Sequence, residues 1–259
     1  MKKLIDRLYS DYAMPSQLAA HESVIVTAAE AGYKQLSVRE FFLGLQDQLP
    51  ENACVMVHRH DIDTDLRTAR KLFEIEKRHQ VRSSFYFRLS TLDFRLMSEI
   101  EEYGSEASYH YEELATFAKR HGLKQAADVL HRLPEIKKEF TRNFFWIEKK
   151  LGRKMTTVAS HGDFANRRLK LQNTVILGDA DLRGECGIAC EAYDSALMKN
   201  TDIYISDRPH PQYFFPTTPR DALGRHARIY LLTHPRQFET NWTENTKENL
   251  SRLYQSLIW

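Results

Sequence analysis

Apolar positions along this chain follow two different periodicities. In residues 136–151 they recur about every 3.6 residues, which predicts an amphipathic helix. Elsewhere they form short runs rich in β-branched and aromatic residues, which favour strands. On this basis we predict strands at residues 53–58, 83–87, 106–110, 155–160 and 228–233.

Helical spacing occupies most of the chain between these strands. Residues 1–50 read as a mostly helical lead-in, and residues 165–222 hold short apolar pieces that indicate short strands and loops. Strands that alternate with helices imply right-handed crossovers and a mostly parallel sheet or barrel. The predicted helices cover residues 65–79, 93–103, 111–151 with a break at Pro134, and 243–257.

Composition narrows the class of protein. The chain has 259 residues, 42% of them hydrophobic, and this length and composition fit a single α/β domain over 1–259. A net charge of +2 gives no reason to expect a nucleic-acid partner.

No apolar run approaches the roughly 18–20 residues of a membrane span. Charged residues from Asp6 onward interrupt any signal-like start, so we expect a cytoplasmic protein, and its three cysteines suggest reduced thiols.

Polar clusters follow four of the predicted strands. In parallel α/β folds, catalytic groups gather at the carboxyl ends of the strands. Each cluster here contains a histidine, and the first also contains two carboxylates two residues apart, which would point to one face of a strand. Like charges held side by side need a positive neighbour. The clusters are His60-Asp61-Ile62-Asp63, Tyr109-His110-Tyr111-Glu112, Ser160-His161-Gly162-Asp163 and Thr233-His234-Pro235.

These residue types suit a divalent metal that keeps an open position for water. Activated water needs a base, and the leaving group needs an acid. One carboxylate of the Asp-x-Asp pair could bind the metal while the other acts as base, and a later histidine could be the acid.

Structural interpretations of the same residues stay open at this point. Asp61 and Asp63 could cap a helix or pair with Arg59 or Arg67, and Arg59 could equally orient Asp61 or a substrate oxygen. We expect His58 and His60 either to support the site residues from behind or to be structural. The segment 207–210 reads as a solvated turn, with the border of a pocket as the alternative.

The first, second and last clusters, in this order and at these separations, resemble the motifs of the polysaccharide deacetylase (NodB-homology, carbohydrate esterase 4-like) superfamily. The resemblance covers about residues 53–240 and points to a divergent branch with a His-Asp-x-Asp first motif. It implies an irregular (β/α)7-type barrel, here with its helical lead-in over 1–50. It also implies hydrolysis of acetyl groups on sugars with a divalent metal, for which we expect Zn²⁺.

The resemblance assigns roles to individual residues. Asp61 would be the general base, Asp63 and His110 metal ligands, and His234, in a Leu-x-His motif, the general acid. The second motif of the family has a further histidine four positions on, where this chain has Leu114. We expect His161 to replace it, with Glu112 as the alternative.

The family's Arg-x-Pro motif is also absent. Arg167 or Arg168 is the predicted substitute for positioning a carboxylate, and Arg59 is a further candidate.

The sequence therefore predicts a metal-dependent carbohydrate deacetylase that acts on a precursor of a surface polysaccharide. One alternative is a catalytically silent member of the same fold that binds a glycan or a partner. Another is a metal hydrolase that cleaves a different bond, such as an amide or a phosphoester.

Overall fold

The computed structural model describes residues 2–50 and 52–259, and its strands form one curled sheet. The strand order is β6-β5-β4-β3-β2-β9-β7-β8, with β1 paired to the beginning of β2. Every pairing is parallel except that of β7 with β8. The strands are β1 (Lys34–Leu36), β2 (Val55–Ile62), β3 (Ser84–Phe87), β4 (Glu106–Tyr111), β5 (Thr157–Ser160), β6 (Cys190–Glu191), β7 (Ile203–Asp207), β8 (Phe214–Phe215) and β9 (Arg228–Thr233).

The α/β class and the mostly parallel sheet are confirmed. The sheet curls into a half-barrel, and within the described ranges no hydrogen-bonded ladder joins β6 to β8. Strands β1 and β6 were not predicted, because runs of three and two residues carry too little alternation to be recognised. One of the short apolar pieces between residues 165 and 222, residues 174–177, lies in the 3₁₀ helix η2 rather than in a strand or a loop.

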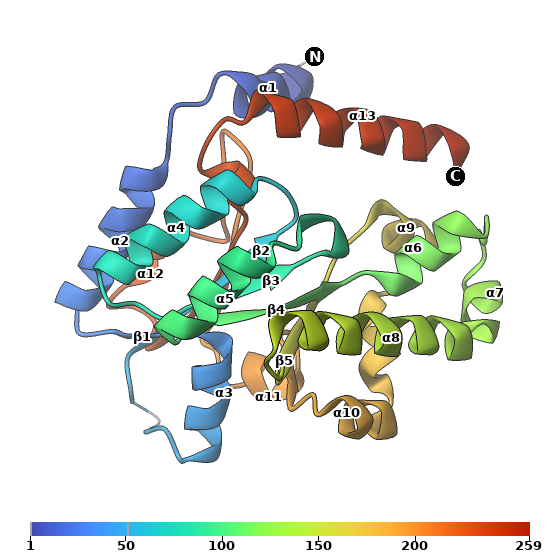
Figure 1. Ribbon diagram of the computed structural model, residues 1–259. Helices are drawn as coiled ribbons and strands as arrows, with labels where there is room; N and C mark the ends of the chain where they lie inside the picture. Colours follow the sequence, from blue (N-terminus) through green and yellow to red (C-terminus); the bar gives the residue numbers. More distant parts are fainter. Residues whose placement is uncertain (1, 51) are drawn as a thin grey trace.

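Helices cover the outside of the curled sheet (Figure 1). They are α1 (Lys2–Tyr12), α2 (Leu18–Glu30), α3 (Val38–Gln46), α4 (Leu66–Arg78), α5 (Phe94–Tyr103), α6 (Glu113–Arg120), α7 (Ala126–His131), α8 (Leu133–Leu151), α9 (Phe164–Leu169), α10 (Ala180–Cys186), α11 (Ser195–Met198), α12 (Pro219–Ala222) and α13 (Trp242–Ile258), with 3₁₀ helices η1 (Leu89–Thr91), η2 (Asn173–Gly178) and η3 (Pro235–Gln237).

Local sequence explains where the clearest helices begin and end. Ser37 starts α3 with a capping box, in which its side chain accepts from the Glu40 amide and the Glu40 carboxylate accepts from the Ser37 amide. Helix α8 buries an apolar stripe that includes Phe140 and Phe144, and Gly152 ends it in the left-handed conformation at φ 70°.

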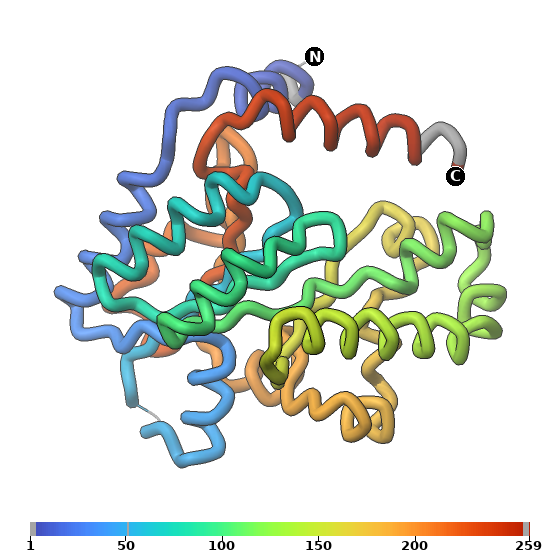
Figure 2. Tube along the Cα trace, viewed as in Figure 1, coloured from blue at the N-terminus to red at the C-terminus, as the bar shows by residue number. Residues whose placement is uncertain are grey.

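The first and last helices of the chain pack together beside the carboxyl edge of the sheet (Figure 1). Helices α1 and α13 pack against each other there, as the traces in Figures 1 and 2 show. Asp11 of α1 connects them, because its carboxylate accepts from Arg236 at 2.6 Å and from Asn249 at 2.8 Å. Among the described residues, every helix is too short or too polar to cross a lipid bilayer.

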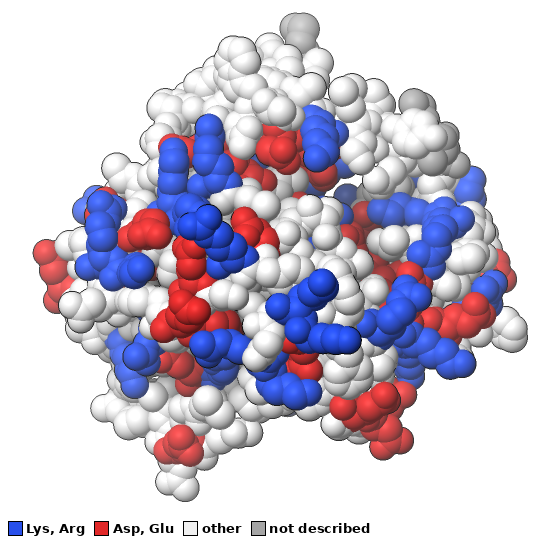
Figure 3. Space-filling view, in the orientation of Figure 1, with Lys and Arg blue, Asp and Glu red and all other residues white. Residues whose placement is uncertain are grey.

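Lys, Arg, Asp and Glu side chains alternate over the face of the molecule drawn in Figure 3. This mixture agrees with the small net charge of +2. The cysteines Cys54, Cys186 and Cys190 are free thiols.

Candidate metal centre

The predicted site residues come together at the carboxyl edge of the half-barrel. Asp61 lies near the end of β2 and Asp63 directly follows it, while His110 lies in β4 and His161 follows β5. Strand β4 pairs with β5 so that His110 lies beside Ala159, which brings the two histidines to the same edge. Their rings meet edge to face with centroids 5.2 Å apart.

Asp63 stands between the two histidines. Its Oδ1 atom is 3.4 Å from Nε2 of His110 and 3.3 Å from Nε2 of His161. The same oxygen is buried and has no hydrogen-bond partner. Asp63, His110 and His161 thus form a group whose donor atoms could hold a metal ion.

The spacing of these donors fits such an ion. Ligands about 2.0–2.2 Å from a tetrahedral metal lie about 3.3–3.6 Å from one another. The two distances from Asp63 Oδ1 fall in this range, whereas a direct hydrogen bond would be about 2.7–3.2 Å. The unpartnered oxygen is the further sign that a cation suits this position.

Neighbouring groups orient both histidine rings. Nδ1 of His110 is 3.0 Å from the carbonyl oxygen of Ala159, which can only accept, so Nδ1 carries a proton and Nε2 is directed toward Asp63. Nδ1 of His161 is 3.4 Å from Glu112 Oε2 on the side away from Asp63, an ion-pair distance without a hydrogen bond. Arg88 holds that Glu112 carboxylate through two hydrogen bonds of 3.1 and 2.7 Å.

This arrangement distinguishes His161 from Glu112. His161 shares the Asp63 and His110 cluster, whereas Glu112 reaches the opposite ring nitrogen of His161. Glu112, His161 and Asp163 form another group of possible ligands. Its carboxylates already have cationic partners, because Arg88 binds Glu112 and Lys119 binds Asp163 at 2.7 Å.

The opposite charges of Asp63 and His161 stabilise each other's ionised form. Burial would raise the pKa of Asp63, but the positive charge of His161 outweighs it and holds this pKa well below the usual range. Burial would lower the pKa of His161, yet Asp63 raises it to about 9. In the absence of another cation, a proton on His161 therefore compensates the Asp63 charge.

Asp61 occupies a different environment from Asp63. Arg59, which is fully buried, binds it side-on through Nε to Oδ1 and Nη2 to Oδ2, both at 2.8 Å. Burial would raise the pKa of Asp61, but Arg59 outweighs this effect and lowers it. Asp61 Oδ2 also lies 3.4 Å from Nε2 of His110. Asp61 is therefore an ionised carboxylate beside the candidate metal position.

His234, immediately after β9, is held by the end of β7. Its Nδ1 donates to Asp207 Oδ1 at 2.7 Å, and its main-chain N–H donates to Asp207 Oδ2 at 2.5 Å. Burial would lower the pKa of His234, but Asp207 raises it to about 9. The imidazole is therefore protonated at neutral pH and has Nε2 available to donate.

Two adjoining hollows open over these residues. One of about 500 Å³ is lined by Asp63, His161, Arg88 and Arg167, and one of about 680 Å³ by Asp63, Asp207 and His234. Arg167 is exposed at the rim of the first hollow, whereas the bonds that position Asp61 come from Arg59. The guanidinium of Arg168 lies over the rings of Phe164 and Trp259.

The sequence did not identify Asp207 or Arg88 as site residues. Asp207 was weighed as part of a solvated turn, but it is buried and ends a strand. Arg88 directly follows β3. Both would have been found by searching the residues at the end of every short apolar run, since catalytic groups gather at the carboxyl ends of parallel strands. Leu114, in place of the second-motif histidine, is buried in the apolar core.

A second cluster of histidines lies on the opposite face of β2, because side chains alternate along a strand. His60 and His58 point there, beneath α2 and α4, where His21, His60 and Glu76 form a further buried group of possible ligands. His60 donates from Nε2 to Glu76 Oε1 at 2.6 Å, a distance too short for two ligands of one ion.

No model of a known protein family matches this chain, and comparison with curated proteins likewise finds no match.

Proposed function

We propose that this protein is a metal-dependent hydrolase that removes an acetyl group from a sugar, with zinc held by Asp63, His110 and His161. The observation that carries the proposal is the spacing of these three donors around an oxygen that lacks a partner. Two Nε2 atoms and one carboxylate form a donor set that suits zinc and leaves a fourth position open. The half-barrel curl also supports the irregular (β/α)7-type architecture of polysaccharide deacetylases.

The chemistry supplied by a cation at this position is Lewis-acid activation of water and of a carbonyl group. Asp61 accepts a proton from the attacking water, because Arg59 keeps its carboxylate ionised and fixes its orientation. His234 donates a proton from Nε2 to the leaving amine or alcohol, and Asp207 keeps it charged for that purpose. The structure thus offers one base and one acid with opposite charges.

Arg59 takes the positioning role for which the family resemblance suggests an Arg-x-Pro motif. It lies two residues before Asp61 on the same strand, so both side chains share one face of β2. Its guanidinium also lies 4.3 Å from the centroid of the Tyr193 ring, which fixes it from the other side. This placement supports catalysis without the missing motif.

The direct test is acetate release from N- and O-acetylated sugars, measured together with the metal content of the purified protein. We expect about one tightly bound zinc per chain, and Asp61→Asn should lower turnover about 10²–10⁴-fold while the metal stays bound. Asp181→Asn, an exposed carboxylate on α10, is the matched control and should behave as wild type. Full activity of Asp61→Asn, or a protein without metal, would contradict the proposal.

The pH profile tests the acid. His234 must be protonated, so activity should fall as the pH rises through about 9. Removing the carboxylate charge with Asp207→Asn should move this alkaline limb toward about 6.5, the ordinary value of histidine. An alkaline limb that stays at the same pH in Asp207→Asn would exclude His234 as the group that titrates.

A further inference from the structure

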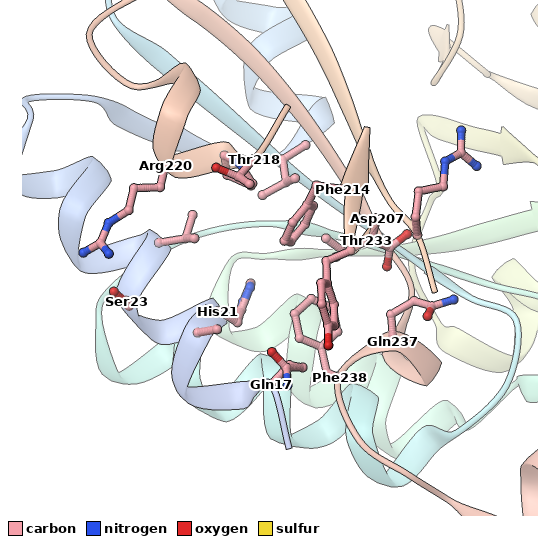
Figure 4. Close-up of a pocket in the computed structure, with 16 residues that line it drawn as sticks. Gln17, His21, Ser23, Asp207, Phe214, Thr218, Arg220, Thr233, Gln237 and Phe238 are labelled. Atoms are coloured by element: carbon pink, nitrogen blue, oxygen red, sulfur yellow. The ribbon is translucent and has the colours of Figure 1, made fainter. Parts of the chain in front are cut away.

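A separate cavity of about 380 Å³ lies on the outer side of the sheet, between α2, α12 and η3. Its size is within the roughly 300–1,000 Å³ typical of small-molecule sites. Figure 4 shows Phe214 and Phe238 between Arg220 at one end and Asp207 at the other. The helical lead-in and the segment after β7 form most of its walls, and it borders the larger hollow over the metal centre, with which it shares Asp207, Arg208 and Gln237.

The middle of the cavity is apolar. Leu231 of β9 and Phe238 beside η3 are buried, while Val24 of α2 and Phe214 of β8 are half-buried and complete the wall. Apolar surface in a cavity open to water favours an apolar ligand, because each buried methylene contributes about 0.8 kcal/mol. A ligand with a hydrocarbon body therefore fits this space.

Two arginines also line the cavity, and neither has an acidic partner. Arg208 and Arg220 are exposed, and neither guanidinium forms an ion pair with any residue that the structure describes. The carboxylate in the wall, Asp207, is already compensated by His234. The charge left at the cavity is therefore positive, which favours an anionic group on the ligand.

We propose that this cavity binds an amphipathic anion, with a hydrocarbon chain in the apolar middle and a phosphate or carboxylate head on Arg208 or Arg220. The shared chemistry is that of fatty acids and of alkyl or isoprenyl phosphates. The inference goes beyond the proposed hydrolase and does not depend on it, because none of the proposed zinc ligands Asp63, His110 and His161 lines the cavity.

Isothermal titration with three probes of one chain length tests the proposal. Octyl phosphate and octanoate carry the two candidate heads, and 1-octanol carries none. We expect at least one anion to bind at least about tenfold more tightly than 1-octanol, since a charged head adds hydrogen bonds to arginine. The stronger of the two anions identifies the head group. Equal affinity for 1-octanol and both anions would overturn the proposal.

Variants locate the binding. Ala20→Trp fills the cavity from an exposed position of α2 and should abolish binding, whereas Ala19→Trp, exposed and outside the lining, should not. The double variant Arg208→Gln/Arg220→Gln should weaken anion binding at least about fivefold and leave 1-octanol unchanged. Arg225→Gln, an exposed arginine outside the lining, is its control.

Inorganic phosphate separates this cavity from the metal centre. A phosphate ion without a chain should bind at least about tenfold more weakly than octyl phosphate, because it leaves the apolar middle empty. Binding of octyl phosphate that is unchanged in Ala20→Trp would place the ligand elsewhere and overturn the proposal.

Discussion

A cluster of histidines and carboxylates lies against each face of β2. The two clusters differ in how the charge of a buried carboxylate is compensated. On the inner face, Asp63 Oδ1 lies 3.3 and 3.4 Å from two histidine nitrogens and has no hydrogen bond. On the outer face, Glu76 accepts from His60 at 2.6 Å and from Ser83 at 2.5 Å, so both of its oxygens are bonded.

This difference is the reason for which we propose a metal site at the inner cluster and a structural role for the outer one. In the outer cluster both nitrogens of His60 are hydrogen-bonded, because Thr233 lies 2.6 Å from its second nitrogen. Nε2 of His21 lies 3.3 Å from Glu76 Oε1 without a hydrogen bond. In the inner cluster Asp63 Oδ1 has no hydrogen bond, and its distances to the two histidine nitrogens fit those between ligands of one metal ion. Both clusters are built from similar residues, so composition alone does not tell them apart. The two clusters differ in the distances between their nitrogen and oxygen atoms, and these differences are less than 1 Å.

The comparison predicts the largest effect for Asp63→Ala. The variant should lose the bound metal and with it all turnover above background, because one of three ligands is gone. Its stability should fall less than that of an outer-cluster variant, since Asp63 Oδ1 makes no hydrogen bond. Metal content and thermal unfolding of the same sample measure both. Retention of one metal per chain would show that the cluster is misassigned.

Glu76→Gln should have the opposite effect: it should lower stability and leave the metal content unchanged. Removing the charge from a buried, histidine-paired carboxylate should lower the free energy of unfolding by about 3–5 kcal/mol. The metal content per folded chain should stay as in wild type, because Glu76 lies on the other face of β2. Urea unfolding and elemental analysis test this, with Glu74→Gln on the same helix as the control. Loss of metal here would mean that the outer cluster also holds an ion.

Glu112→Gln should have an intermediate effect on the inner cluster alone. Glu112 contacts the far nitrogen of His161, and loss of such a contact typically weakens metal affinity about 10–100-fold. Competition with a chelator measures the affinity, and Glu185→Gln, exposed on α10, is the reference. If Glu112 were itself a ligand, the metal would be lost entirely, as in Asp63→Ala.

At neutral pH the smallest effect concerns His58 of the outer face, because its contribution to stability appears only below about pH 6.5. Burial lowers its pKa to about 3, so it stays neutral in the folded protein and gains a proton on unfolding below about 6.5. The unfolded state therefore binds more protons between these values, and stability falls with decreasing pH by up to about 1.4 kcal/mol per unit. In His58→Gln this contribution should disappear from stability profiles between pH 4 and 6. An unchanged slope would show that His58 is protonated in the fold.

The inner cluster was largely predictable because strand alternation and strand ends are local properties. Asp61 and Asp63 had to share a face once β2 was recognised, and Arg59 joined them for the same reason. His110 and His161 followed from the rule that parallel strands end at one edge. Asp207 was missed because its strand is short, and the outer cluster because His21 comes from a helix in the lead-in.

By itself, the sequence determined which residues end the strands, since periodicity and turn residues act within a few positions. Only the tertiary structure decided which donors meet and at what distance. The order of the strands placed His161 rather than Glu112 against Asp63. The packing of α4 on β2 joined Glu76 to His60 by a hydrogen bond, and α2 placed Nε2 of His21 3.3 Å from the same carboxylate oxygen. Such spacings depend on the register and packing of segments far apart in the chain, which no local pattern encodes.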